Sequence, residues 1–518
     1  MSALDWCVMA LYLLGMLLLA AYIGRQQRSA SDYFLAGRTM SSGALAASTL
    51  ATQCSTNSLL GAPAFVGFTL GGGLIWLQYE LAVPLAMAAL IWLIVPARQA
   101  GVTSIYAILE MRLGVASRKV ASASFLLFRG VATGVTIYGV SLVLALLLDI
   151  SYLAAVALLM TVTIAYDLLG GLRAVVISDV IQLLLLTATV AISLVLLASD
   201  GGWQTLLSSR TDTLVNDWGM SGNDYGFWPM LIGGLFLYAA YYGCDQSQTQ
   251  RVLAARSDAA AQRVLLLNGL LRFPLVLGYC LLGIGLAAFA TAHPEFLTEL
   301  PRTAAGAPNF NLVFPAYVLD QFAPGFVGLV MVGLLAAAMS SIDSAINSLS
   351  AATLEDFVQP RAQLQGRRAL LASRGITLLW GVFCVGLSFQ VETIAPTVLE
   401  AVNKIGSMAN GPLLALFVIA LLIDGVGQRN ALIGCAIGLG SNCALAFGAP
   451  DVSWLWWNVS GFGCSLLSAL LLSARPGNPK PLRLVRYRYP PRTATVCALA
   501  AMATAILAIC LLLDGYQP

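Results

Sequence analysis

Stretches of about 20 apolar residues recur along the whole chain, and this feature limits the fold more than any other. A helix needs about 20 such residues to cross the hydrocarbon core of a bilayer. Only 10% of the 518 residues are charged and 59% are hydrophobic, so the chain cannot cover itself with polar surface in water. We place spans at 5–24, 43–70, 74–97, 119–149, 152–172, 175–198, 227–247, 264–290, 326–352, 375–392, 397–424, 430–449, 452–474 and 494–514. The sequence therefore predicts an all-α polytopic membrane protein with about 14 transmembrane helices.

The basic residues test these spans, because cytoplasmic loops retain Lys and Arg. With the N-terminus outside, nearly all of the 27 basic residues fall in inward loops or at nearby helix ends, and we count Arg272 among them. The exceptions are Arg210 and Arg302 in outward loops, and Arg129 and Lys404 inside spans. We therefore expect both termini outside. The plain topology without sorting signals is typical of a bacterial inner membrane.

The order of the spans predicts the domain organisation. Spans two to six and seven to eleven form two sets of five that start from opposite sides, which is the arrangement of an inverted repeat. We expect a first repeat at 43–198 and a second at 227–424, with an outer loop at 199–226 between them. Residues 1–42 are the N-terminal helix and a cytoplasmic loop, and residues 425–518 are peripheral C-terminal helices.

The first span of each set carries polar residues in its middle. Inverted-repeat transporters interrupt these helices there, and the freed backbone groups bind ions and substrate. Span two reads ATQCSTNS from Ala51 to Ser58, a run that is costly against lipid but suited to lining a cavity. Packing between helices is the alternative. We take as candidate substrate ligands Gln53, Ser55, Asn57 and Ser58, with Tyr241 and Tyr242 from span seven.

Two carboxylates lie inside predicted spans. Asp179 falls near the cytoplasmic end of span six, and Asp343 shares a face of span nine with Ser344. Buried carboxylates recruit a cation or a proton, so we expect one or the other at these two carboxylates. The alternative is that Asp179 pairs with Arg173 or Arg251 as a latch of the closed inner gate.

Arg129 is a cation near the middle of the membrane. It lies 11 residues beyond Arg118 at the inner boundary, or about 16 Å along a helix. An uncompensated arginine there costs several kcal/mol, and a guanidinium fork is a natural partner for a carboxylate. We therefore expect Arg129 to bind a substrate carboxylate. The alternative is an internal ion pair with Glu80 of span three.

Other function classes fit poorly. The single histidine, His293, falls in an outer loop, and the ten cysteines have no metal-ligand spacing, so we do not expect an enzyme. A net charge of +3 gives no sign of nucleic-acid binding. A transporter-like sensor is a rival, but no soluble output domain follows residue 474.

Four ordered motifs resemble the sodium/solute symporter family, and the resemblance runs over most of the chain. They are Asp32–Arg38 (DYFLAGR), Gly170–Gln182 (GGLRAVVISDVIQ), Gln246–Ser257 (QSQTQRVLAARS) and Ala336–Ser348 (AAAMSSIDSAINS). The resemblance implies a five-plus-five inverted-repeat core with discontinuous first helices. It also implies secondary active import: a small organic solute crosses the lipid bilayer into the cell, and Na⁺ is the coupling ion that is transported with it.

The resemblance also implies cation ligands. The family's shared sodium site falls on the backbone carbonyls of Ala51, Cys54 and Ala337 and on the hydroxyls of Ser340 and Ser341. Serine hydroxyls bonded within their own helix are the alternative. Some members bind a second sodium at the equivalents of Asp179, Asp343 and Ser344, and Asp343 replaces a serine there.

The resemblance leaves two substrate classes open. Gln78 matches a glutamine of the sialic-acid branch, whose carboxylate-binding arginine falls at Ala132, one turn beyond Arg129. Glu80 resembles the glutamate with which sugar-carrying members bind hydroxyls, and Tyr241 aligns with their aromatic inner gate. We expect a small carboxylate-bearing solute, with a neutral sugar or polyol as the alternative.

Overall fold

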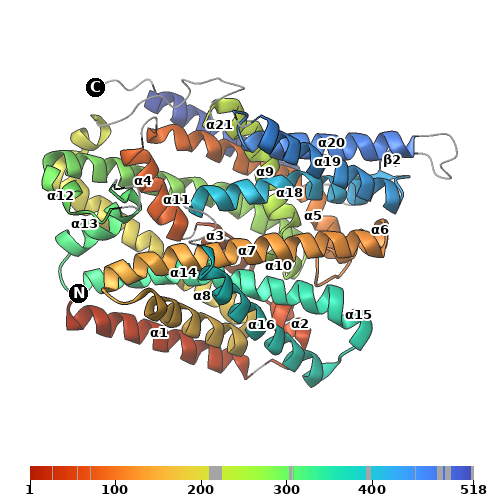
Figure 1. Cartoon of the computed structure of the whole chain (residues 1–518), viewed down its shortest axis with the longest axis horizontal. Helices are drawn as coiled ribbons and strands as arrows, with labels where there is room; N and C mark the ends of the chain where they lie inside the picture. Colours follow the sequence, from red (N-terminus) through yellow and green to blue (C-terminus); the bar gives the residue numbers. More distant parts are fainter. Residues whose placement is uncertain are drawn as a thin grey trace.

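The protein is a bundle of α-helices that run roughly along one axis (Figure 1). The computed structural model describes residues 1–25, 27–54, 56–69, 72–208, 225–302, 306, 308–391, 398–449, 451–474, 482–484 and 492–514. Within these residues, ten helices are long and apolar enough to cross a membrane, and three shorter apolar helices accompany them. Each of these long or short apolar helices overlaps an apolar stretch that the sequence singled out, whereas short helices such as Ala107–Arg112 and Pro294–Glu299 lie between those stretches.

In the first half of the chain, the described residues form helices as their only regular structure. Its elements are α1 (Ala3–Gly24), α2 (Ala30–Leu35), η1 (Ala36–Arg38), α3 (Ser42–Gln53), α4 (Thr56–Phe68), η2 (Gly73–Leu81), α5 (Ala82–Gln99), α6 (Ala107–Arg112), α7 (Val115–Leu148) and α8 (Tyr152–Ser208).

The second half adds helices and one small strand pair. Its elements are η3 (Pro229–Gly233), α9 (Gly234–Cys244), α10 (Gln246–Leu253), α11 (Asp258–Ala292), α12 (Pro294–Glu299), η4 (Phe310–Leu312), α13 (Val313–Gln321), α14 (Phe326–Thr353), η5 (Leu354–Val358), α15 (Gln359–Ala362), α16 (Gly366–Ser388), α18 (Val398–Leu422), β1 (Ile423–Asp424), α19 (Gln428–Gly448), α20 (Leu455–Ser473), β2 (Arg483–Leu484) and α21 (Thr493–Asp514). The antiparallel β1–β2 pair is an element that the sequence did not predict.

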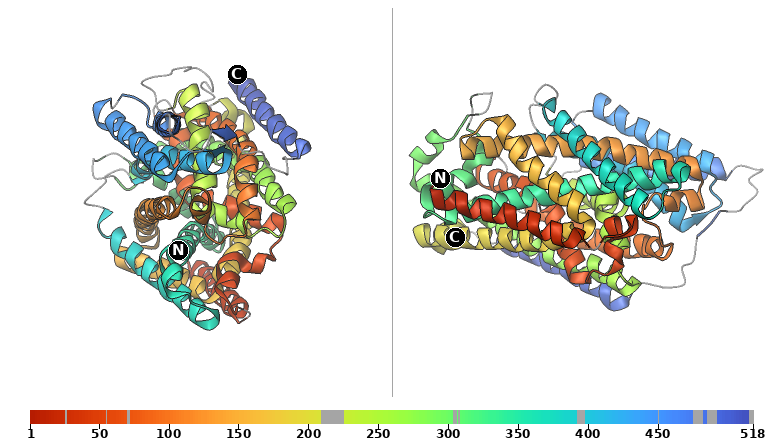
Figure 2. Two further views of the ribbon diagram at one scale, coloured as in Figure 1. Left: turned by 90° about the vertical axis from the view of Figure 1, so that its right-hand side faces the viewer. Right: turned by 90° about the horizontal axis from the view of Figure 1, so that it is seen from below.

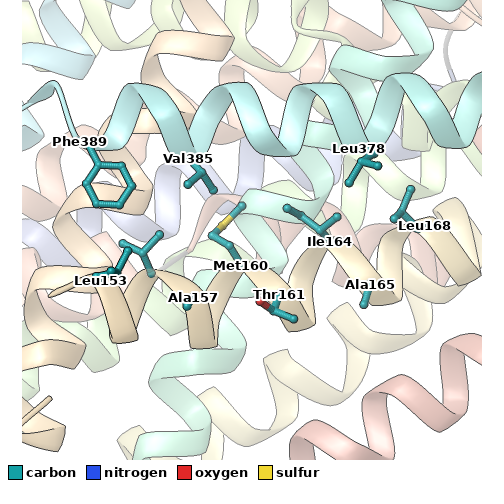
Figure 3. A pocket seen from close by; sticks show the side chains of 11 residues that line it. Leu153, Ala157, Met160, Thr161, Ile164, Ala165, Leu168, Leu378, Val385 and Phe389 are labelled. Atoms are coloured by element: carbon teal, nitrogen blue, oxygen red, sulfur yellow. The ribbon is translucent and has the colours of Figure 1, made fainter. Parts of the chain in front are cut away.

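Helix α8 reverses its direction at Gly171. Its 57 residues would extend about 86 Å if straight, far beyond a bilayer core of about 30 Å. Its first limb runs along α16, where Leu153 and Phe389 lie at one end of a groove and Leu168 and Leu378 at the other (Figure 3).

The second limb of α8 returns along α1. At the turn, Leu169 lies against Gly24, the last residue of α1. Beyond the turn, Gln182 Nε2 donates to Tyr12 Oη, in the middle of α1, at 3.0 Å. Gly171 has φ +51°, and a Cβ there would lie 2.7 Å from Tyr33, so only glycine suits this turn. The residues of α8 thus form two limbs that run in opposite directions.

Two helices are interrupted at the polar segments noted in the sequence. Helix α3 ends at Gln53, the following Cys54 has a ψ of 64° that is not helical, and α4 begins at Thr56. Helix α9 ends before Asp245, which is extended with ψ 122°, and α10 follows. Helix α14 is buried along nearly its whole length and contacts α3, α4 and α10, so it packs against both interrupted helices.

The two ends of the bundle differ in composition. Helix α1 begins and α21 ends at the same end as α12 and α13, whereas α6, α15 and β2 lie at the opposite end (Figures 1 and 2). The opposite end carries Arg112, Arg361 and Arg483 on those three elements. The bundle therefore has one end that carries the basic loops.

Candidate functional site

The break between α3 and α4 meets two serines of α14. Ser340 Oγ donates to the carbonyl oxygens of Ala51 at 3.2 Å and Ala337 at 3.1 Å. Ser341 Oγ donates across the interface to Thr52 O at 2.8 Å. The alternative, in which the serine hydroxyls bond only within their own helix, therefore holds in part for Ser340, which bonds to Ala337 O and also to Ala51 O. It does not hold for Ser341, which bonds to Thr52 O of α3. The residues named for the sodium site thus converge here, with Cys54 buried at the break itself.

A buried arginine lies next to this convergence. Arg251 of α10 donates from Nε to Ser48 Oγ at 2.9 Å and from Nη2 to Thr52 Oγ1 at 3.0 Å. Its Nη2 also contacts Ser344 Oγ and lies 3.4 Å from Asp179 Oδ2. Both Arg251 and Asp179 are 0% exposed. The structure thus realises the alternative in which Asp179 pairs with Arg251.

Asp343 is the unpaired carboxylate of this region. It is fully buried on α14, and neither of its oxygens has a hydrogen-bond partner within the described part of the chain. The second oxygen of Asp179, Oδ1, and the side-chain oxygen of Gln182 are also buried and unpartnered there. Unpartnered buried oxygens of this kind are suited to a cation or a proton.

The second interrupted helix meets Arg129 of α7. Arg129 Nη1 lies 3.7 Å from Asp245 Oδ2 in the break between α9 and α10. Its guanidinium carbon lies 5.7 Å from the centre of the Tyr241 ring, within the range of a cation–π contact. Tyr241 Oη in turn accepts a hydrogen bond from Gln248 Nε2 at 2.9 Å.

Glu80 is paired with a different arginine from the one considered in the sequence. Arg272 of α11 donates from Nε and Nη2 to the two carboxylate oxygens of Glu80, at 2.7 and 2.9 Å, and also to Tyr238 Oη at 2.8 Å. The suggested Glu80–Arg129 pair is therefore wrong. The placement of Arg272 at an inner helix end is also wrong, because α11 begins at Asp258 and Arg272 lies about 21 Å along it.

The remaining predicted substrate residues lie around these two breaks. Gln78 is buried on η2, and neither atom of its amide has a partner in the described structure. Tyr242 Oη and Gln53 Oε1 are likewise buried and unpartnered there, and Ser58 Oγ donates to Gln53 O at 3.5 Å. Ser55 and the side chain of Asn57 lie outside the described residues.

Comparison with known proteins places the chain in a family. The profile of the sodium:solute symporter family matches residues 33–438. The mouse sodium-coupled monocarboxylate transporter 1 is 30% identical over 463 residues, which cover 86% of this chain and 73% of that protein. The chain belongs to the sodium:solute symporter family. The sodium/sialic acid symporter NanT of Aliivibrio fischeri is 26% identical over 472 residues, covering 89% of this symporter and 91% of NanT.

Solved structures show the same fold. A Na⁺-coupled sialic acid symporter in a substrate-bound, outward-open state matches 93% of this chain and 100% of its own, with a TM-score of 0.84 and 23% identity. Mhp1, of the nucleobase-cation-symport-1 family, matches 91% of this chain and 94% of its own, with a TM-score of 0.57 and 14% identity. The symporter is an integral membrane protein with this all-α, LeuT-like fold. As a sodium-coupled solute symporter it is a transporter and not an enzyme, and Na⁺ is its coupling ion.

Sequence reasoning missed two parts of the symporter's site. Arg272 and Tyr238 were not assigned, although an arginine so far into an apolar span signals a buried partner. The contacts of Arg251 with Ser48 and Thr52 were also missed, because they join helices about 200 residues apart in the chain. No local pattern reports such a meeting.

Proposed function

We propose that this symporter imports a small carboxylate-bearing organic solute together with sodium by alternating access. The observation that carries the proposal is the contrast between two buried cations. Arg272 donates to both carboxylate oxygens of Glu80 and to the hydroxyl of Tyr238, whereas Arg129 has one long ion pair and a buried Nε without a hydrogen-bond partner among the described residues. Arg129 is therefore the cation that has bonding capacity for a substrate carboxylate.

The same contrast disfavours a sugar substrate. A glutamate that binds sugar hydroxyls needs carboxylate oxygens to accept their hydrogen bonds. Both oxygens of Glu80 already accept from Arg272. The unpartnered amide of Gln78 and the hydroxyl of Tyr242 can bind polar groups of either substrate class, with Gln53, Ser55, Asn57, Ser58 and Tyr241 as further proposed ligands.

The coupling sodium is assigned to the break of the first repeat. Its proposed ligands are the carbonyls of Ala51, Cys54 and Ala337 and the hydroxyls of Ser340 and Ser341. The hydrogen bonds from Ser340 to two of these carbonyls support the assignment. They show that a carbonyl of α3, a carbonyl of α14 and the Ser340 hydroxyl are close enough together for one ion to contact all three. A carbonyl freed by an interrupted helix is the usual sodium ligand in inverted-repeat transporters.

A second cation, sodium or proton, is assigned to Asp179, Asp343 and Ser344. The unpartnered carboxylate of Asp343 supports it. Arg251 contacts Asp179 and Ser344 in this structure, so a cation bound by all three residues requires that Arg251 move away. The bound ion and the contacts of Arg251 with Asp179 and Ser344 therefore exclude each other.

We further propose that the chain crosses a bacterial inner membrane fourteen times, with both termini on the outer side of that membrane. Ten long helices, the reversal of α8 at Gly171 and three shorter apolar helices account for this number. The basic end of the bundle faces the cytoplasm by the positive-inside rule. The breaks at Cys54 and Asp245 support a five-plus-five inverted repeat over 43–198 and 227–424, joined by 199–226 and flanked by 1–42 and 425–518.

The test is thermal stabilisation of the purified protein by sialic acid, lactate, biotin and neutral sugars, each with and without sodium. A ligand that binds the native state raises the melting temperature by mass action. We expect sodium-dependent stabilisation by a carboxylate and its loss in Arg129→Ala. Sodium-dependent stabilisation by a neutral sugar alone, retained in Arg129→Ala, would reject the proposal. Sodium-driven uptake into liposomes separates a symporter from a sensor.

A further inference from the structure

Asp245 makes two separate sets of contacts at the break between α9 and α10. Its Oδ1 accepts hydrogen bonds from Ser247 N at 2.7 Å and from Ser247 Oγ, so it caps the first turn of α10. Its Oδ2 lies 3.7 Å from Arg129 Nη1. One carboxylate therefore joins the start of α10 to the arginine of α7.

The ion pair between Asp245 and Arg129 is longer than the buried pair between Arg272 and Glu80. Arg272 and Glu80 meet through two hydrogen bonds of 2.7 and 2.9 Å. Arg129 and Asp245 approach only to 3.7 Å, and Arg129 Nε has no partner in the described residues. A ligand that offers two oxygens in one plane would satisfy the guanidinium fork better than Asp245 does.

Helix α10 connects this pair to the contacts of Arg251. The helix has eight residues, from Gln246 to Leu253, with Asp245 as its N-cap and Arg251 near its other end. Arg251 holds α3, α8 and α14 through Ser48, Asp179 and Ser344. A change in the position of Asp245 therefore acts on a helix whose opposite end holds three elements together.

We propose that Asp245 is an internal competitor that binds Arg129 until the carboxylate of a substrate displaces it. The proposal rests on the proposed function, because it requires that the substrate carry a carboxylate. Displacement frees Asp245 from α7 while its cap on α10 persists, and so α10 can move with the contacts of Arg251. The substrate is thereby coupled to the inner side, because it binds only the state in which Arg129 is free.

Asp245→Asn separates the charge of this residue from its role in the helix cap. Asparagine is as good an N-cap as aspartate but does not compete for a cation. We expect Asp245→Asn to bind the best carboxylate probe among sialic acid, lactate and biotin more tightly, by about 5–150-fold. Its affinity for the methyl ester of the same probe should not change. Asp320→Asn, which removes an exposed carboxylate, is the matched control and should leave both affinities unchanged.

The decisive comparison is a double-mutant cycle measured by calorimetry on the full-length protein in sodium. The gain from Asp245→Asn should vanish in the Arg129→Ala background, because there is then no cation to compete for. An unchanged or weaker affinity in Asp245→Asn overturns the proposal, and so does an equal gain with and without Arg129. If Asp245→Asn fails to fold, Asp245→Ser retains an N-cap and gives the same comparison. Binding of neutral sugars alone by the wild type rejects the carboxylate substrate itself, which is a distinct result.

Discussion

Arg251 of α10 and Asp179 of α8 form a fully buried ion pair, with 3.4 Å between Nη2 and Oδ2. The same guanidinium contacts Ser48 and Thr52 of α3 and Ser344 of α14. The second interrupted helix is therefore tied to the first and to the two helices that flank the proposed cation sites.

Removing the charge of either partner of this ion pair should destabilise the protein. Asp179→Asn or Arg251→Gln leaves one uncompensated charge buried, which costs about 3–5 kcal/mol. Thermal unfolding in detergent should show a clear loss for each single variant and less than the summed loss for the double variant. Asp258→Asn breaks the partly exposed pair with Arg98 and should cost less than about 1 kcal/mol. If the loss of stability in the double variant equals the sum of the losses in the two single variants, the two charges are not coupled.

Removing either hydroxyl of the proposed sodium site should weaken sodium binding. Ser340→Ala and Ser341→Ala each delete an oxygen at the break of α3, and we expect the sodium concentration for half-maximal stabilisation to rise about tenfold. A sodium titration of the melting temperature measures this. Ser348→Ala is the control, since its hydroxyl bonds to Ala345 O within its own helix. An equal shift in all three variants would argue against the assigned site.

Asp343→Asn should remove one coupled cation. The carboxylate is buried without a partner among the described residues, and the amide has no charge with which to hold an ion. We expect one fewer cation per transported solute, measured from the reversal potential of uptake into liposomes. A stoichiometry equal to that of the wild type would remove Asp343 from the proposed site.

Asp5 should stabilise the start of α14 from a different helix. Its Oδ1 accepts hydrogen bonds from the backbone N–H groups of Gly325 and Gly328, both at 2.7 Å. Asp5→Ala leaves these donors unsatisfied, so we expect a loss of about 1–3 kcal/mol in thermal unfolding. Asp5→Asn retains an acceptor and should lose less. Equal effects of both variants would mean that charge alone is responsible.

The apolar helices and the two breaks were predictable from the sequence, but the buried ion pairs were only partly so. Asp179 and Arg251 were considered as one of two alternatives, and Ser340 and Ser341 were assigned by resemblance. Arg272 was misplaced because Asp258, in the polar segment before span eight, already belongs to α11. Apolar periodicity does not report how far a helix extends into a loop.

The sequence by itself determined the class, the positions of the membrane-crossing stretches and the polar residues at which helices break. These are local properties, because the cost of exposing a polar group to lipid depends on the residue and its near neighbours. Only the tertiary structure decided which acidic residue pairs with which buried arginine. Glu80 meets Arg272 at a separation of 192 residues, and Arg129 meets Asp245 instead of Glu80. Which partners meet depends on the packing of helices that are distant in the chain, and that packing decides which arginine has bonding capacity for a substrate.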